Sequence, residues 1–320
     1  MSQEQPRMYE LEYPSPDMSA SDTEGPTLIV ALQGYADAGQ AIDASAQHIL
    51  AALEHGLVAS FNNDELVDYR SRRPTVVLDH NRIADVDPLE IGLPVVRDNA
   101  GKPFLLLTGP EPDMRWSAFT KAVADLAERF GVSQTLCLYS APMAVPHTRP
   151  LVVTAHGNIP ELTGKHFTLD SRIHIPGAAS LMLERTLDER GKNVGGLTAH
   201  VPHYLAASDY PLATLRLLES LSDDAGLSIP LGTLQADADR VMQQLSSQID
   251  DAPEIHQVVR ALEQQYDREL ERYEASQESA ALDFEAIPSG EALGEAFEQF
   301  LATFDPPNDS DSLENGDSDK

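Results

Sequence analysis

The sequence predicts an α/β fold with a largely parallel sheet, followed by a helical appendage. Three observations indicate this fold class. Uninterrupted apolar runs, of which Phe104–Leu107 is one, are typical of parallel strands that are buried on both faces. Such runs alternate with segments whose apolar residues recur every three or four positions, which is the period of an amphipathic helix. From about residue 230 onwards only the helical period continues.

The chain opens with residues 1–26, which are rich in Pro, Ser, Glu and Asp and are expected to form a flexible N-terminal segment. The α/β domain is expected over 27–229. Its first strand is predicted at 27–32, and a glycine turn leads from there into a helix. That helix presents one apolar face, made by Ile42, Ala46, Ile49 and Leu53.

The middle of the domain repeats the alternation of strands and helices. Residues 57–97 consist of β-prone pieces between polar turns, which favours an antiparallel extension of the sheet. A central strand is predicted at 102–109. The helix after it carries Trp116, Phe119, Val123, Leu126 and Phe130 at helical spacing. Further strands are predicted at 135–138, 151–155 and 193–199, and further helices begin near 177 and at Pro211.

Apolar residues at helical spacing predict a C-terminal helical region over 230–304. Its longest helix carries an apolar stripe from Ile255 to Tyr273, which is expected to pack on the body or on a neighbouring subunit. A shorter helix is predicted from Leu293 to Phe304. Residues 305–320 are mainly Asp, Ser and Asn and are expected to form a disordered acidic tail.

Charge and composition argue against several classes of function. The 320 residues include 22 basic and 52 acidic side chains, a formal net charge of -30, which argues against nucleic acid or an anionic membrane as a partner. The single cysteine, Cys137, excludes a disulfide within the chain. No stretch resembles a signal peptide or a membrane span, so a cytoplasmic protein is expected.

Two short segments that contain Val-Pro-His mark the candidate site. In the first, Thr148 and Arg149 follow His147; in the second, His203 and Tyr204 follow another β-prone run. Ligands of parallel α/β sheets bind beyond the carboxyl ends of the strands, so the two segments are expected to share one site. Arg149 would grip a carboxylate or a phosphate there. The alternative is structural, with Arg149 paired to one of the chain's many acidic residues.

Two turns that follow predicted strands supply the remaining candidates. The turn with Gly34 and Asp37 precedes a helix whose first N–H groups would face an anion. The spacing of its glycines does not match the dinucleotide-binding fingerprint. Glu111 follows the central strand, where a functional carboxylate would be found. The structural alternatives are a tight glycine turn and a carboxylate that stabilises the start of a helix.

No metal site, cofactor or covalent mechanism is predicted. His200 and His203 are three positions apart, so on a strand their side chains would point to opposite faces. Ser140 lies near a histidine-bearing loop, but its neighbours do not form the Gly-x-Ser-x-Gly turn of the α/β-hydrolases. A phosphate-binding Gly-Lys-Ser/Thr loop is also missing from the sequence.

Several longer sequence segments resemble those of the proteasome assembly chaperone family, second-subunit type, in its actinobacterial branch. They are Gly109–Trp116, Val145–Pro150, Val201–Leu205, Gln33–Gly39 and Leu262–Asp267, and the resemblance covers about residues 27–275. It implies a three-layer α/β/α sandwich with a mixed, mostly parallel sheet, similar to the phosphorylase/hydrolase-like fold. It also implies homo- or hetero-oligomers, with a homotrimer as one form. Members that dock on proteasomes end in a hydrophobic residue, a tyrosine and any residue, whereas this sequence ends Ser318-Asp319-Lys320.

The expected function is therefore that of an oligomeric, non-enzymatic protein of the chaperone or assembly-factor type, which binds copies of itself and a protein partner. The alternative is an enzyme with a phosphorylase/hydrolase-like fold. It would act on a small anionic or nucleoside-like substrate at the strand-end cleft.

Overall fold

The computed structural model describes residues 8–13, 25–35, 37–87, 89–168, 172–250 and 253–277. The helix predicted from Leu293 to Phe304, the tail at 305–320 and most of the segment 1–26 lie outside these residues. Over the ranges that are described, none of the helices combines the length and the hydropathy that a membrane crossing requires.

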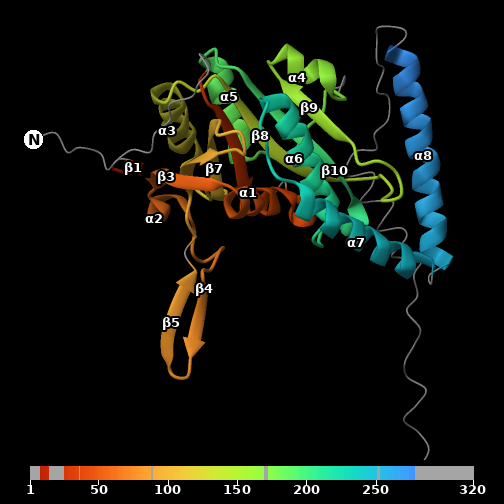
Figure 1. Cartoon of the computed structure of the whole chain (residues 1–320), viewed down its shortest axis with the longest axis horizontal. Helices are drawn as coiled ribbons and strands as arrows, with labels where there is room; N and C mark the ends of the chain where they lie inside the picture. Colours follow the sequence, from red (N-terminus) through yellow and green to blue (C-terminus); the bar gives the residue numbers. More distant parts are fainter. Residues whose placement is uncertain are drawn as a thin grey trace, which may run out of the picture.

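A mixed sheet of eight strands forms the centre of the molecule (Figure 1). Its four inner strands pair in parallel, in the order β7 (Pro103–Pro110), β2 (Thr27–Gln33), β8 (Gln134–Met143) and β10 (Val194–Pro202). Antiparallel pairs extend it through β6 (Gly92–Arg97), β3 (Glu54–Phe61) and β1 (Tyr9–Leu11) on one side, and through β9 (Val153–Gly157) on the other. Because β3 and β7 are both antiparallel to β6, five of the eight strands point the same way, and the predicted mixed, mostly parallel sheet is confirmed.

Helices cover both faces of the sheet and complete the predicted three-layer sandwich. On one face lie α1 (Ala41–Ala52) and α6 (Pro211–Ala225), which share a buried apolar cluster with the strands. On the other face, α3 (Trp116–Arg129) and α5 (Ala179–Glu189) belong to a second cluster. The connection after β2 therefore crosses one face of the sheet, and the connection after β7 crosses the other face.

Alternation along β2 shows why both faces need a helical layer. Ile29 and Ala31 enter the first apolar cluster, whereas Leu28 and Val30 enter the second. Successive strand residues point to opposite faces, so a strand that is apolar at every position must be covered on both. Each of these four side chains is at most 1% exposed, as that arrangement requires.

The described C-terminal residues form two further helices, α7 (Gly232–Asp250) and α8 (Pro253–Gln277). α7 packs against the face formed by α1 and α6, where Ala238 is buried. α8 stands at the side of the body beside the ends of β8 and β10 (Figure 1). Its stripe, which includes the buried Val259, Leu262 and Tyr266, faces the body.

Part of the predicted antiparallel extension does not join the sheet. Residues 65–69, predicted as β-prone, begin within a single helical turn, α2 (Asn63–Leu66), whose Leu66 is fully buried. Among the strands of the described residues, β4 (Thr75–Asp79) and β5 (Arg82–Asp87) pair only with each other, in a hairpin that projects from the body (Figure 1). The remaining short elements are α4 (Pro160–Lys165) and the 3-10 turns η1 (Ala38–Gln40) and η2 (His203–Leu205).

β8 is longer than the sequence predicts. The strand was expected to end at Leu138 because prolines follow, but it continues to Met143 and pairs Pro142 with Val201 of β10. β2 pairs with β8 only as far as Cys137. Beyond that point an isolated bridge between Asp37 and Ser140 is the last β2-side pairing of β8 among the described residues, so a residue without a backbone N–H is tolerated at Pro142.

Candidate functional site

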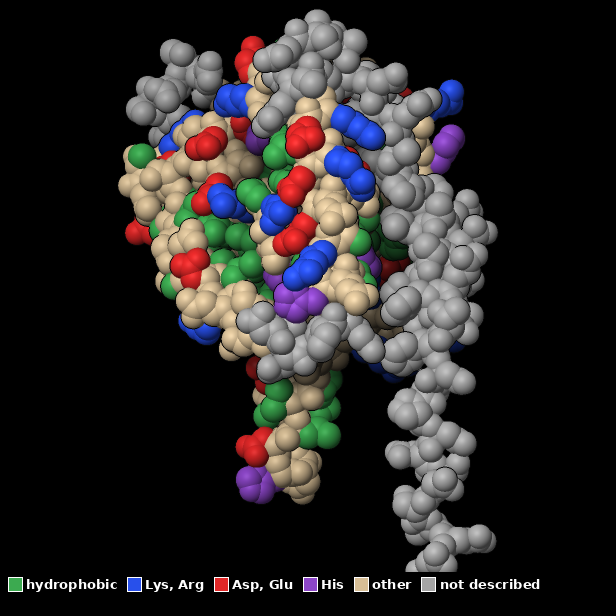
Figure 2. All heavy atoms as spheres, turned by 90° about the vertical axis from the view of Figure 1, so that its right-hand side faces the viewer, with side chains coloured by type: hydrophobic (Ala, Val, Ile, Leu, Met, Phe, Trp, Pro, Cys, Tyr) green, Lys and Arg blue, Asp and Glu red, His purple; other side chains and the backbone are tan. Residues whose placement is uncertain are grey.

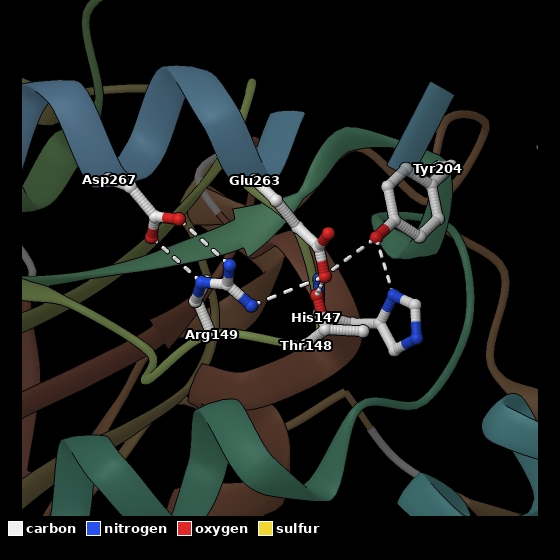
Figure 3. A network of polar contacts seen from close by, with 6 residues as sticks. All are labelled: His147, Thr148, Arg149, Tyr204, Glu263 and Asp267. Carbon is white, nitrogen blue, oxygen red and sulfur yellow. Dashed lines mark hydrogen bonds and ion pairs between the residues drawn. The ribbon is translucent and has the colours of Figure 1, made fainter. Parts of the chain in front are cut away.

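The loop after β8 is held by α8 through the arginine that the sequence marks as an anion anchor (Figure 3). Arg149 donates from Nε and Nη2 to the two carboxylate oxygens of Asp267, at 2.8 Å each. Its Nη1 pairs with Glu263 at 3.2 Å. The hydrogen bond to Asp267 raises the pKa of Arg149 and lowers the pKa of Asp267. The guanidinium is thus already matched by the chain's own carboxylates.

Thr148 and His147 complete this cluster. Thr148 Oγ1 donates to Glu263 at 2.6 Å. The hydroxyl of Tyr204 accepts the backbone N–H of His147 at 2.9 Å and lies 2.7 Å from its ring Nδ1. Burial lowers the pKa of His147, so its ring is mainly neutral at pH 7, and its tautomer decides whether Nδ1 donates to the tyrosine hydroxyl or accepts from it. Burial also raises the pKa of Tyr204 to about 12.

His203 joins the cluster only at its margin. β8 and β10 do end side by side, as the shared-site prediction requires, since Met143 pairs with Pro202. The exposed ring of His203, however, makes a T-shaped contact with Tyr204, with 5.3 Å between the ring centroids. Tyr204 in turn contacts His147. The structure therefore brings the predicted residues together, but around α8 and the tyrosine instead of an open cleft.

The turn between β2 and α1 uses Asp37 to start the helix. Its Oδ1 accepts the backbone N–H of Ile42 at 2.7 Å, and its Oδ2 accepts that of Asp43 at 3.3 Å. Burial raises the pKa of Asp37, and the two backbone hydrogen bonds oppose that rise. Both N–H groups are therefore bonded within the chain, as in a capped helix.

Glu111 also serves a helix, but not the one that follows it in the sequence. Its buried carboxylate accepts the backbone N–H of Ala179, at the start of α5, at 2.5 Å. Gly34 lies so close to this carboxylate that a Cβ atom at position 34 would overlap with it. The glycine therefore permits the approach of three segments, the turn after β2, the end of β7 and the start of α5.

An open hollow of about 360 Å³ lies beside the turn after β2. It is lined by Gln33, Gly34, Asp37, Gln40, Asp43 and Arg72. Arg72 is engaged, since it donates to the carbonyl of Gln33 at 3.2 Å and pairs with Asp113 at 3.3 Å. The hollow sits where the chain leaves neighbouring strands for opposite faces, the position at which open α/β sheets bind ligands. Its carboxylates and carboxamides suit a polar ligand with several N–H or O–H donors.

A third polar network, which sequence reasoning missed, joins β8, β9 and α5. His156 Nε2 lies 2.9 Å from one oxygen of Glu184, and the other oxygen accepts the hydroxyl of Tyr139 at 2.6 Å. Burial opposes a charge on His156, but the hydrogen bond and the charge of Glu184 outweigh it and raise the pKa. The three residues lie on three separate elements, so no sequence spacing links them. In the part of the chain that is described, no group of three or more His, Cys, Asp or Glu side chains is arranged to hold a metal ion.

Comparison with known proteins places this chain in a family. The model of the PAC2 family matches residues 31–249. A protein of unknown function from Corynebacterium glutamicum has a similar structure, with 61% identity and a TM-score of 0.82, over 83% of this chain and 99% of its own. A Mycobacterium tuberculosis protein of unknown function is similar at 48% identity and a TM-score of 0.80, over 83% of this chain and 93% of its own.

A more distant neighbour bears on the fold alone. The proteasome-assembly chaperone homologue of Mycobacterium tuberculosis is 22% identical, with a TM-score of 0.67, over 73% of this chain and 99% of its own. It shares the α/β architecture described above. No curated protein matches this chain.

Replacing Arg149 should loosen α8 while the sheet stays folded. Arg149→Ala removes the bidentate bond and leaves Asp267 and Glu263 without their shared cation. We expect faster hydrogen exchange of the α8 amides and unchanged exchange in β2 and β8. The matched control is Arg185→Ala, which removes an exposed ion pair within α5. Equal protection of α8 in the wild type and in Arg149→Ala would contradict this role.

The His156–Glu184 pair should make stability depend on pH. Because folding raises the pKa of His156 above its ordinary value of about 6.5, its contribution is complete below that pH and is lost as pH rises through the folded-state pKa. The wild type should therefore exceed His156→Gln in melting temperature most at weakly acidic pH, with the gap narrowing above neutrality. A gap that is constant between pH 5.5 and 8.5, or that widens with pH, would sink this assignment.

Proposed function

Since this chain belongs to the PAC2 family, we propose that it works as an oligomeric, non-enzymatic binding protein of the assembly-factor type. It binds a protein partner through its surface and releases that partner after assembly. Subunits of a proteasome core are the first candidates, because the sequence and the fold resemble proteasome assembly chaperones.

The strongest support for a binding role is that the positively charged side chain at the ends of the strands already pairs with carboxylates of the same chain. An enzyme that processes an anion aims hydrogen-bond donors or positive groups at the reacting atoms. Here Arg149 is matched by two carboxylates of α8, and Arg72 by Asp113. Asp37 and Glu111 accept N–H groups at the starts of helices. Arg149, Asp37 and Glu111, three of the predicted site residues, thus already have partners within the chain, which supports a binding role.

Self-association is part of the proposal. The chain forms a homo-oligomer, and the family resemblance suggests a trimer. A net charge of -30 disfavours contact between copies over most of the surface, so the interface must lie where few carboxylates meet.

An assembly factor should capture an unassembled partner and be missing from the finished complex. Tagged protein, purified from its native cytoplasm, should retain one protein in a fixed ratio, identified by mass spectrometry. Deleting the gene should then lower the yield of the partner's assembled complex while the partner's own level is kept. A retained protein whose assembly does not respond to the deletion would contradict the assembly role.

The hollow beside the turn after β2 favours a second function. Its volume of about 360 Å³ is within the range of small-ligand sites. The ribose and base of a nucleoside offer the O–H and N–H donors that Asp43 and the two glutamines would accept. The second candidate is thus an enzyme acting on a nucleoside-like substrate, and the carboxylates disfavour a purely anionic one.

Thermal shift separates the two functions. If the second candidate holds, adenosine or guanosine should raise the melting temperature of the wild type, and Asp43→Asn should abolish that rise. Asp125→Asn, which alters an exposed carboxylate on α3, is the control. Inorganic phosphate alone should have no effect. If neither nucleoside shifts the wild type at millimolar concentration, the hollow is not a nucleoside site and the enzyme alternative fails.

A further inference from the structure

The loop that leads into α5, residues 172–177, presents two isoleucines to solvent. All six of its residues are exposed, with Ile173 at 49% and Ile175 at 60%. Met182, in the first turn of α5, is a further apolar side chain at the surface, at 38%. Single apolar residues are ordinary on a protein surface, but a group of them marks a surface that another segment or molecule covers.

Basic side chains alternate with the isoleucines of this loop. Arg172 precedes Ile173, and His174 separates it from Ile175. Neither basic side chain has a hydrogen bond or an ion pair within the part of the chain that is described, whereas Arg149 is matched by two carboxylates. The loop thus combines aliphatic surface with a cation that has no carboxylate partner there. Such a surface suits an occupant that is apolar and acidic.

The sequence after α8 contains a segment of that character. Residues 293–304, called here the C-terminal segment, lie outside the described residues. At helical spacing, the segment would carry Glu295 and Glu298 on one face, and no basic residue occurs between Arg272 and Lys320. Four apolar side chains would share the opposite face of that helix, namely Leu293, Phe297, Phe300 and Phe304.

The C-terminal segment is able to reach the 172–177 loop. α8 ends at Gln277, and the ring of its Tyr273 lies on Phe167, with 3.9 Å between the ring centroids. Phe167 is six residues before Ile173, and six residues span at most about 20 Å. The 15 residues 278–292, which link α8 to the segment, reach roughly 50 Å when extended.

The surface of α8 and the charge of the chain narrow the choice of binding surface. The outward face of α8 carries Lys, Arg, Asp and Glu side chains (Figure 2), and its apolar stripe already faces the body. α8 therefore offers little apolar surface to the segment that follows it. A chain with a net charge of -30 repels an acidic segment over most of its surface, whereas Arg172 attracts it.

We propose that residues 293–304 bind the 172–177 loop of the same chain and pack their apolar face on Ile173 and Ile175. The inference goes beyond the proposed function and does not depend on it. The loop then serves as an internal docking surface, and its isoleucines are covered by the chain's own C-terminal segment.

Attachment to the same chain favours this occupant over a second copy. A link of the length of residues 278–292 gives an effective concentration on the order of a millimolar. A surface that binds the segment with a dissociation constant of about 0.1 mM would then be about nine-tenths occupied. The segment of a second copy lacks this advantage and arrives with a body that repels the first.

Hydrogen exchange of the full chain tests the proposal from both sides of the contact. Amides of 172–177 and of 293–304 should exchange about tenfold more slowly in the wild type than in Ile175→Ser or in Phe297→Ser. Each variant should thus expose the other partner, while exchange in β2 is unchanged. The matched controls are Val258→Ser, at an exposed aliphatic position on α8, and Phe284→Ser, in the link. Both should keep the wild-type rates.

Two results of this experiment would overturn the proposal. If the amides of 172–177 exchange equally fast in the wild type and in Phe297→Ser, the segment does not cover the loop. If the protection of 293–304 survives in Ile175→Ser, the segment binds elsewhere and the loop is not its surface.

Cross-linking provides a second readout, which also identifies the chain that supplies the segment. Cys137 is fully buried and is the single cysteine of the sequence, so two added thiols react only with each other. Under mild oxidation the double variant Ile175→Cys with Phe297→Cys should form a disulfide within one chain, seen on a denaturing, non-reducing gel. Val258→Cys with Phe297→Cys should form little.

The products of cross-linking decide between the possible occupants. A disulfide between two chains would assign the loop to the segment of a second copy and contradict docking within the chain. Equal cross-linking from positions 175 and 258 would indicate random collision and would contradict a defined surface.

Discussion

Burial of the inner strands on both faces is the constraint on which the rest of this structure depends. Because Leu28 and Ile29 point to opposite apolar clusters, neither face of β2 is left to solvent. The connections must then supply helices to both sides, and α1 and α3 do so from neighbouring strands. Where these two connections part, the turn after β2 and the end of β7 leave a hollow, with Gly34 and Glu111 in contact beside it. The place of the candidate ligand site thus follows from the burial pattern.

The scarcity of basic side chains also shapes the surface. With 22 basic side chains against 52 acidic ones, each cation near the strand ends has several carboxylates available. Arg149, Arg72 and Arg115 each pair with at least one of them. Other carboxylates accept N–H groups at helix N-termini instead, as Asp37 and Glu111 show. An acidic composition is therefore compatible with a scaffold in which the basic side chains connect secondary-structure elements to one another.

Much of the fold was predictable from local pattern, because strand and helix periods are properties of neighbouring residues. The apolar face of α1, the central strand β7 and the proline start of α6 all followed from spacing. The partners of Arg149 did not, since Glu263 and Asp267 are 114 and 118 residues away. The strand-end position of Glu111 was readable, but its contact with Ala179 on a later helix was not. β4 and β5 show the same limit, because alternating residues look alike in a sheet and in a projecting hairpin.

The ion pairs of Arg149 with Asp267 and Glu263, called here the clamp on α8, have a thermodynamic consequence for any ligand that would bind the same arginine. Such a ligand binds only chains in which Asp267 and Glu263 have moved away, and this open population is small whenever the clamp is favourable. Its apparent dissociation constant is the intrinsic one divided by the open fraction. α8 therefore acts as a built-in competitor at fixed effective concentration. Acidification to a pH below the ordinary pKa of a carboxylate would protonate Asp267 and weaken its bond to the arginine. The open fraction would then rise, and an anion that stays charged would bind more strongly.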